Sequence, residues 1–331
     1  MTRPTRLAST VVALLLAVVA CAPSGGLGPV PTVPPTASPS TAPSGPDITP
    51  EPTGPSAPPS PSTGPSTGPS SAPSTPPSAT PSGTPVETMI VRAYYVLRGD
   101  VGVEGLVPTL RVVPKSSGVA RAAMEALLDS ATIRDAYRDI SSAIPAGTRL
   151  LSISIRNGVA TVDLSREFES GGGSASALNR LGQVVYTLTQ FSTVRAVLFQ
   201  VEGRTVTTFG SEGIVLDGPQ ARSDLVDLLP SIFVDRPAFG AAAGNPAHVT
   251  GNANVFEATF RIAVLDGAGK TLVDQQAMAT CGTGCRGTFD VTLKYTLAKA
   301  QWGTLRVYFG SAKDGSPQDI RDYPVWLTPA S

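Results

Sequence analysis

Residues 150–164, with the sequence LLSISIRNGVATVDL, decide the fold of the first folded region. Apolar and polar residues alternate on both sides of Asn157-Gly158, and this period of two predicts two half-buried strands. The apolar positions are Leu151, Ile153 and Ile155 before the turn, and Ala160, Val162 and Leu164 after it. Asn-Gly between two alternating runs is a strong signal for a β-hairpin. We therefore expect an antiparallel hairpin here.

The segments around the hairpin predict a mixed layer of strands and helices. Further strands are expected at 89–97, 109–113, 194–201 and 205–209. One helix is expected after Ser117 and another after Ser174 or Ser176, because serine caps the first turn of a helix. The apolar stripes of the two helices are Val119, Ala123, Ala126 and Leu127, and Leu178, Leu181, Val185 and Leu188. Two helices on one face of a largely antiparallel sheet make an α+β fold.

A second folded region follows, with turn signals at intervals of about ten residues. Phe256–Leu265 alternates apolar and polar residues, and Asp266-Gly267 follows it as a turn. Further strands are expected at 288–295, 303–310 and 323–327, and no helix is expected. About seven short strands in about a hundred residues are typical of an all-β immunoglobulin-like sandwich.

The N-terminus has the pattern of a secretory signal. Arg3 and Arg6 precede the apolar run Val11–Ala20, which is about half of the roughly 20 apolar residues needed to span a bilayer. Val18-Val19-Ala20-Cys21 resembles the bacterial lipobox, in which the cysteine is lipidated after cleavage. The resemblance implies a signal peptide at 1–20, a lipid on Cys21 and a location on the outer face of the cell membrane. An uncleaved membrane helix is the alternative.

A linker is predicted between the lipid and the folded regions. From 22 to 85 the chain is almost entirely Pro, Ser, Thr, Gly and Ala, with Asp47 and Glu51 as its only charges. Such a segment cannot bury enough apolar surface to offset the entropy lost on ordering. We therefore expect lipidated Cys21 and a disordered Pro/Ser/Thr-rich linker over 21–86, a first domain over 87–222 and a second over 229–328.

Three segments of the first domain form a recognisable pattern: residues 144–148 (IPAGT), 158–165 (GVATVDLS) and 183–190 (QVVYTLTQ). They resemble, in this order, the lead-in, the strand and the end of the helix of the GerM (GerMN) family of spore-germination proteins and envelope lipoproteins. In the second domain, residues 249–258 (VTGNANVFEA) resemble a strand of the immunoglobulin-like domain of bacterial spore germination. The two resemblances imply a binding or assembly role at the cell envelope.

Three cysteines are present, and Cys21 is assigned to the lipid. Cys281 and Cys285 remain, with Gly282-Thr283-Gly284 between them. Export places them in an oxidising compartment, and two glycines let the backbone turn tightly, so a disulfide is predicted. A zinc site would need more ligands, and a redox pair normally has two-residue spacing.

The sequence offers few groups for catalysis. His248 is the only histidine, and no serine motif lies beside it. Asp163, Glu167 and Glu169 were weighed as paired carboxylates for sugar hydrolysis, but solvated surface acids are favoured. Gly171–Gly173 lacks the Lys-Ser/Thr of a phosphate-binding loop. Arg149, Arg156, Arg166 and Arg180 could meet an anionic partner, but scattered solvated cations are the favoured interpretation. No catalytic residue, metal or cofactor is therefore expected.

Charge limits the range of partners. Positive and negative residues balance, so the sequence does not favour nucleic acid as a partner. We expect a non-catalytic lipoprotein that contacts the membrane through its lipid and binds another envelope protein or peptidoglycan. The alternatives are a cell-wall hydrolase or its accessory, or the accessory lipoprotein of a sensor kinase. The sequence does not fix the oligomeric state.

Overall fold

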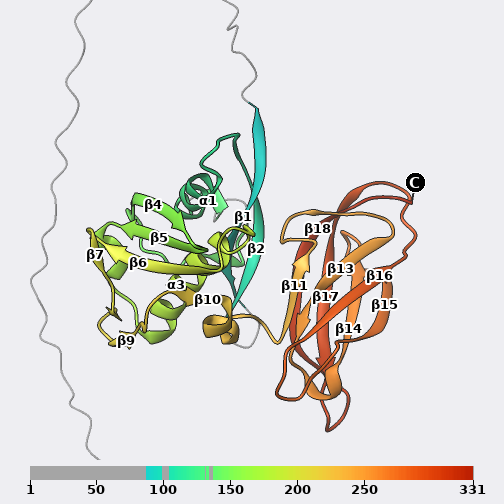
Figure 1. Cartoon of the computed structure of the whole chain (residues 1–331). Coiled ribbons are helices and arrows are strands. Elements are labelled where there is room, and N and C mark those ends of the chain that lie inside the picture. The colour runs from blue at the N-terminus through green and yellow to red at the C-terminus, as the bar shows by residue number, and fades with distance from the viewer. Residues whose placement is uncertain (1–86, 99–103, 131, 134–136, 331) are drawn as a thin grey trace, which may run out of the picture. The chain divides into compact units, whose positions relative to one another are not determined.

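The structure is a computed structural model and describes residues 87–98, 104–130, 132–133 and 137–330 (Figure 1). The predicted signal peptide, Cys21 and the linker lie outside these residues.

The first domain opens with a long antiparallel pair. β1 (Thr88–Leu97) pairs with β2 (Gly105–Pro114) along its whole length, from Thr88 opposite Pro114 to Leu97 opposite Gly105. At its far end, β1 also pairs with the two-residue β3 (Ile140–Ser141). The order of this sheet is β2-β1-β3.

The predicted hairpin lies in a second sheet, and this prediction is confirmed. β4 (Leu150–Arg156) and β5 (Val159–Leu164) are antiparallel, and both Asn157 and Gly158 have positive φ, as a type I′ turn requires. The chain then crosses through α3 (Ser174–Leu188) to β6 (Ala196–Val201), which pairs with β5 in parallel. The sheet order β10-β6-β5-β4 leaves β4 at the edge.

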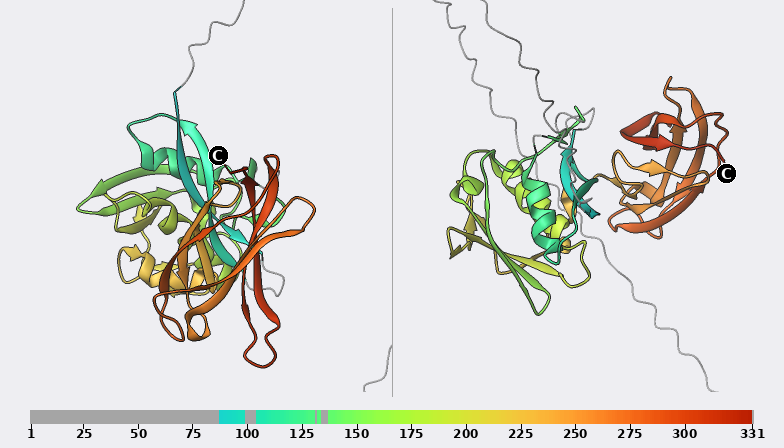
Figure 2. Two further views of the ribbon diagram at one scale, coloured as in Figure 1. Left: turned by 90° about the vertical axis from the view of Figure 1, so that its right-hand side faces the viewer. Right: turned by 90° about the horizontal axis from the view of Figure 1, so that it is seen from above.

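The helices pack between the two sheets. α1 (Val119–Leu128) contacts β1, β2 and β4, and α3 contacts β1 and β6 (Figure 2). Their inward residues, including Met124, Leu127, Leu181 and Val185, are fully buried. The α+β class is therefore confirmed, with the strands divided between two sheets rather than joined in one.

The predicted serine caps are wrong. Gly118 is the N-cap of α1 and Gly173 is the N-cap of α3, and neither helix has a side-chain cap. Ser117 lies one residue before the N-cap, and the Gly118 N–H donates to Ser116 Oγ at 3.0 Å. Glycine is tolerated at this position because it adopts the non-helical backbone without a steric cost.

Short elements complete the first domain. β7 (Arg204–Thr205) pairs with β6, β8 (Thr208–Phe209) pairs with β9 (Ile214–Val215), and β10 (Gln220–Ala221) pairs with β6. A short 3-10 helix spans Arg222–Leu228.

The second domain is the expected sandwich. One sheet has the order β11-β13-β16 and the other β12-β18-β17-β14-β15 (Figure 1). Phe260 on β14 and Phe289 on β16 join the two layers with ring centroids 4.8 Å apart. The strands are β11 (Ile232–Arg236), β12 (Ala242–Ala243), β13 (Ala247–Ala253), β14 (Thr259–Leu265), β15 (Thr271–Met278), β16 (Gly287–Leu293), β17 (Gln301–Gly310) and β18 (Pro317–Leu327).

One predicted strand begins later than expected. Phe256–Ala258 forms a 3-10 turn, and β14 starts only at Thr259. Glu257 and Ala258 both have positive φ, which a strand does not allow, and Phe256 is exposed rather than inward. Apolar alternation alone cannot show this turn.

Candidate functional site

The carboxylates weighed for catalysis serve the fold instead. Asp163 Oδ1 accepts a hydrogen bond from the Gly203 N–H at 2.9 Å and so holds the turn between β6 and β7. Glu167 lies in a short 3-10 helix, Arg166–Glu169, where a hydrogen bond with the Ser165 side chain lowers its pKa. A general acid needs a raised pKa, so the surroundings of Glu167 favour the opposite state. Glu169, half-buried, follows the buried Phe168.

The glycine run before α3 is held by a buried arginine. Arg180 is 2% exposed, so its interpretation as a solvated cation is wrong. Its guanidinium donates to the Phe168 carbonyl at 2.7 Å and to the Gly171 carbonyl at 2.5 Å. Desolvation lowers the pKa of Arg180. A Cβ on Gly172 would meet Ser176 Oγ at 2.6 Å, so Gly172 lies close against the start of α3.

His248 lies on β13 and is exposed. Its Nδ1 is 3.2 Å from Thr292 Oγ1, on the paired residue of β16. Among the residues that the structure describes, no group of three or more His, Cys, Asp and Glu side chains could hold a metal ion. No helix in the same described part of the chain is long and apolar enough to cross a membrane.

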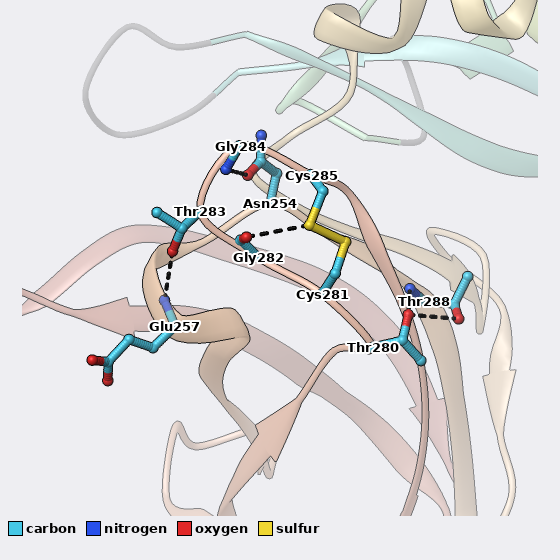
Figure 3. The surroundings of a disulfide bond; sticks show 9 residues. All are labelled: Asn254, Glu257, Thr280, Cys281, Gly282, Thr283, Gly284, Cys285 and Thr288. Carbon is cyan, nitrogen blue, oxygen red and sulfur yellow. Dashed lines mark hydrogen bonds between the residues drawn. A yellow bond between two sulfur atoms is a disulfide. The ribbon is translucent and has the colours of Figure 1, made fainter. Parts of the chain in front are cut away.

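Cys281 and Cys285 are joined as a disulfide, with their Cα atoms 6.0 Å apart (Figure 3). The loop between them docks on the 3-10 turn that precedes β14. Thr283 N–H donates to the Val255 carbonyl at 3.0 Å, and Thr283 Oγ1 accepts from Glu257 N–H at 3.0 Å. A Cβ on Gly282 would come within 2.4 Å of Val255 O, so this contact requires glycine. The disulfide loop therefore holds the segment before β16 against the 3-10 turn before β14.

A polar ladder on α3 covers the open edge of β1. Gln183 and Thr187 are four residues apart and share one face of α3, and Gln190 lies two residues beyond the end of the helix. Gln183 Nε2 donates to Tyr94 O at 2.9 Å, and Thr187 Oγ1 accepts from Tyr94 N–H at 3.0 Å. Gln190 Oε1 accepts from Arg92 N–H at 2.9 Å. The side chains therefore supply the hydrogen bonds that a neighbouring strand would otherwise make.

Gln183 also reaches a second segment. Its Oε1 accepts from Ala143 N–H at 2.7 Å, beside the end of β3. The side chain is fully buried, and one amide therefore joins α3, β1 and the segment after β3. The C-terminal end of α3 is held by Arg222, which donates to Tyr186 O at 3.0 Å and lies over the Tyr186 ring at 4.8 Å. A cation is favourable at this end of a helix.

The edge of β4 is bordered by a groove of about 400 Å³. The groove lies between the start of α1 and β4, and its apolar walls include Val119, Ile153, Ile155 and Phe191. The register irregularity between Leu150 and Ser152 leaves Leu151 unpaired and 41% exposed, so its predicted place on the inward face is wrong, and Leu150 opposite Leu164 takes that place. Ile155, on the inward face, is 39% exposed. The apolar face of the predicted hairpin is therefore only partly covered at β4, in contrast to β5, where Ala160, Val162 and Leu164 are all fully buried.

Two family comparisons match the two domains in order. Residues 92–207 match the Germane family, described as sporulation and spore germination, and residues 231–316 match Gmad2, the immunoglobulin-like domain of bacterial spore germination. The chain carries a GerMN domain followed by a Gmad2 domain. The resemblance predicted from the sequence is confirmed, and neither family description names a catalytic activity. No curated protein sequence matches the chain.

Solved structures give distant similarities. Tandem GerMN domains of the sporulation protein GerM from Bacillus subtilis are 16% identical, with a TM-score of 0.37; the match covers 63% of this chain and 62% of that one. The first GerMN domain of the same protein is 24% identical, with a TM-score of 0.35, over 40% of this chain and 99% of that one. A candidate lipoprotein from Clostridium perfringens is 18% identical, with a TM-score of 0.28, over 45% of this chain and 98% of that one.

The GerMN motif now has a physical explanation. Residues 183–190 include all three members of the polar ladder, Gln183, Thr187 and Gln190. Sequence reasoning treated this segment as the end of an amphipathic helix and assigned no task to its polar residues. The four-residue spacing of Gln183 and Thr187 is the available signal, because buried polar residues on one face of a helix need partners.

Proposed function

We propose that this protein is a non-catalytic, membrane-anchored envelope protein that displays its GerMN and Gmad2 domains for binding or assembly at the cell surface. The observation that carries the proposal is that three polar residues of the GerMN domain make hydrogen bonds within the fold. Asp163, Arg180 and Gln183 bind main-chain atoms of neighbouring segments. These groups hold the fold together and are not arranged around a common reacting centre.

The lipobox-like segment that ends at Cys21 supports the location. Acyl chains on this cysteine would hold the protein on the outer face of the membrane, since two lipid chains give stable anchoring. The Pro/Ser/Thr-rich composition of 22–85 supports a spacer between the membrane and the GerMN domain. In this arrangement the two domains face the space where wall polymers and other envelope proteins lie.

Localisation in cells tests the anchor. The full chain should fractionate with membranes, and Cys21→Ser should shift most of it to the medium or the soluble envelope fraction. Cys281→Ser is the matched control, because it makes the same chemical change at a cysteine that the proposal does not assign to lipid. Retention of Cys21→Ser in the membrane in full amount would contradict the proposal.

A wall-digestion assay tests the absence of catalysis. Purified full chain is incubated with peptidoglycan, and soluble sugar and peptide fragments are measured. No release above buffer is expected, whereas release that grows with protein concentration would favour the hydrolase alternative. Cross-linking in living cells then separates the two partner classes, since recovery of one membrane protein favours assembly or signalling and recovery of wall fragments favours wall binding.

A further inference from the structure

We propose that the free edge of β4 binds an extended, acidic peptide segment of another protein, which adds to the sheet as its next strand. The inference deepens the proposed binding function, since it assigns that function a surface and a class of partner. It is a main-chain recognition mode in which hydrogen bonds provide affinity and side-chain pockets provide specificity.

The first step is the direction of the β4 hydrogen bonds. In an antiparallel pair, hydrogen-bonded and non-hydrogen-bonded residue pairs alternate. Arg156 and Val159 flank the two-residue turn as a hydrogen-bonded pair, so Ser154 opposite Thr161 is hydrogen-bonded as well. The main-chain groups of Ile153 and Ile155 therefore point away from β5. In the described part of the chain, no strand pairs with that side of β4.

The second step is the lack of protection at this edge. Natural edge strands are usually guarded by lysine, proline, a bulge or great shortness, because open edges attract other strands. The central segment of β4, Ser152–Ile155, contains neither lysine nor proline. The register irregularity of β4 lies between Leu150 and Ser152, so it borders this segment but does not interrupt it. The edge is therefore fit to accept a strand.

The third step is the groove beside the edge. Side chains of Ile153 and Ile155 line it together with Val119 of α1 and Phe191. A strand added to β4 would continue the pleat, so its side chains on the helix side would enter this groove. The volume of about 400 Å³ lies within the range of ligand clefts, roughly 300–1,000 Å³. Apolar residues at alternate positions of the peptide fit this environment.

The fourth step is charge. Arg149 and Arg156 stand at the two ends of β4, and both are exposed. Arg156 makes no ion pair within the described residues. The groove also contains the start of α1, whose first turn has no acidic residue and whose main-chain N–H groups favour an anion. These charges favour a peptide with Asp or Glu at its ends.

The same charges disfavour a second copy of this chain as the occupant. Antiparallel pairing of two β4 strands would bring Arg149 of each copy toward Arg156 of the other, and like charges across a strand pair are destabilising. A separate protein with an acidic segment avoids this repulsion.

The test is a selection from a displayed library of random heptapeptides on the full chain, purified in detergent. Enrichment of sequences with alternating apolar residues and terminal Asp or Glu is expected. The most enriched peptide is then labelled and titrated against variants. Ile155→Pro removes one outward N–H and should weaken binding by about tenfold or more, whereas Ile155→Val keeps both the N–H and the apolar side chain and should bind as wild type. No enrichment, or equal binding to Ile155→Pro, would overturn the proposal.

Two measurements guard against misfolding and test the charge. Proline is tolerated on an edge strand where its N–H would face solvent, so Ile155→Pro should keep the wild-type circular dichroism spectrum. If Ile155→Pro does not fold, amide hydrogen exchange of the wild-type protein tests the proposal instead. The peptide should slow exchange at the Ile153 and Ile155 amides, and unchanged exchange would refute the proposal. Arg156→Glu should weaken binding of the acidic peptide by about tenfold and Arg156→Lys should preserve it.

Failure of this test is distinct from failure of the proposed function. The peptide measurements are made on purified protein and do not depend on lipid or location. The Cys21→Ser experiment reports on the anchor and is unaffected by β4.

Discussion

Replacing Gln183 with leucine should destabilise the GerMN domain strongly. The change removes the amide that donates to Tyr94 O at 2.9 Å and accepts from Ala143 N–H at 2.7 Å. Gln183 is fully buried, so water does not readily replace it. Each orphaned buried main-chain group costs about 1–3 kcal/mol. We therefore expect Gln183→Leu to lower the free energy of unfolding by about 2–5 kcal/mol.

The other two ladder positions set a graded series. Thr187→Val has nearly the same shape and orphans only the Tyr94 N–H, so a loss of about 1–3 kcal/mol is expected. Gln190 is half-buried, and water can take over part of its role, so Gln190→Leu should cost about 1 kcal/mol. Gln276→Leu, at an exposed site on β15, is the matched control and should stay within about 0.5 kcal/mol of wild type.

The second domain can serve as an internal reference when the stability of the ladder variants is measured by urea titration. Both tryptophans, Trp302 and Trp326, lie in the Gmad2 domain, while α1 and α3 lie in the GerMN domain. In a urea titration of the full chain, far-UV circular dichroism therefore follows the ladder variants and tryptophan fluorescence follows the unchanged domain. The reasoning is refuted if Gln183→Leu unfolds at the same urea concentration as Gln276→Leu by circular dichroism.

Three further results are expected. Burial raises the pKa of Tyr95 and of Tyr186 to about 12 from 10.0, so folding favours their neutral forms. Their contribution to the free energy of unfolding is therefore complete below pH 10 and falls as the pH rises toward 12. Urea titrations at several pH values should show a less steep fall for Tyr95→Phe than for wild type. Arg180→Met should cost about 2 kcal/mol through loss of its charged hydrogen bonds to Phe168 O and Gly171 O, and a melting temperature equal to that of wild type would contradict this role. Cys281→Ser opens a ring of only five residues, so it should cost no more than about 2 kcal/mol while speeding amide exchange in the loop; a larger loss would show that the disulfide supports the whole sandwich.

Much of the fold could be predicted because its signals are local. The alternation around Asn157-Gly158 fixes the hairpin, since two residues with positive φ suit that turn and few others. The stripe of Leu181, Val185 and Leu188 likewise fixes the buried face of α3. Patterns of this kind depend on neighbouring residues alone, and the structure confirms them.

The features that could not be predicted depend on distant segments. The sequence predicts Ser117 as the cap of α1, but the helix begins one residue later, with Gly118 as its N-cap. Arg180 was interpreted as solvated, because the carbonyls that bind it are placed only when the glycine loop folds back on α3. The tasks of Gln183 and Thr187 require knowing that one edge of β1 lacks a strand neighbour.

The β4 groove shows a third kind of limit. The sequence marks Leu151, Ile153 and Ile155 as apolar, and a buried face was the natural prediction. The partial exposure of Ile153 and Ile155 follows from the sheet order, which places β4 at the end and leaves its groove open beside α1. Leu151 is exposed because the register irregularity before Ser152 displaces it from that face. The alternation of apolar and polar residues predicts on which face of the sheet a side chain lies. Whether other elements cover that face depends on the order of the strands in the sheet.

The long pairing of β1 with β2 has a mechanical consequence. β1 begins at Thr88, directly after the segment that would lead back to the membrane, so tension in that segment acts first on this strand. A pull on Thr88 that is opposed at the end where Leu97 lies opposite Gly105 shears the pair of strands. Its cross-strand bonds then share the load instead of breaking one after another. The ladder residues of α3 bind the other edge of the same strand and add resistance in the same direction. If the segment before Thr88 is anchored as proposed, β1 is the strand of the GerMN domain that tension reaches first.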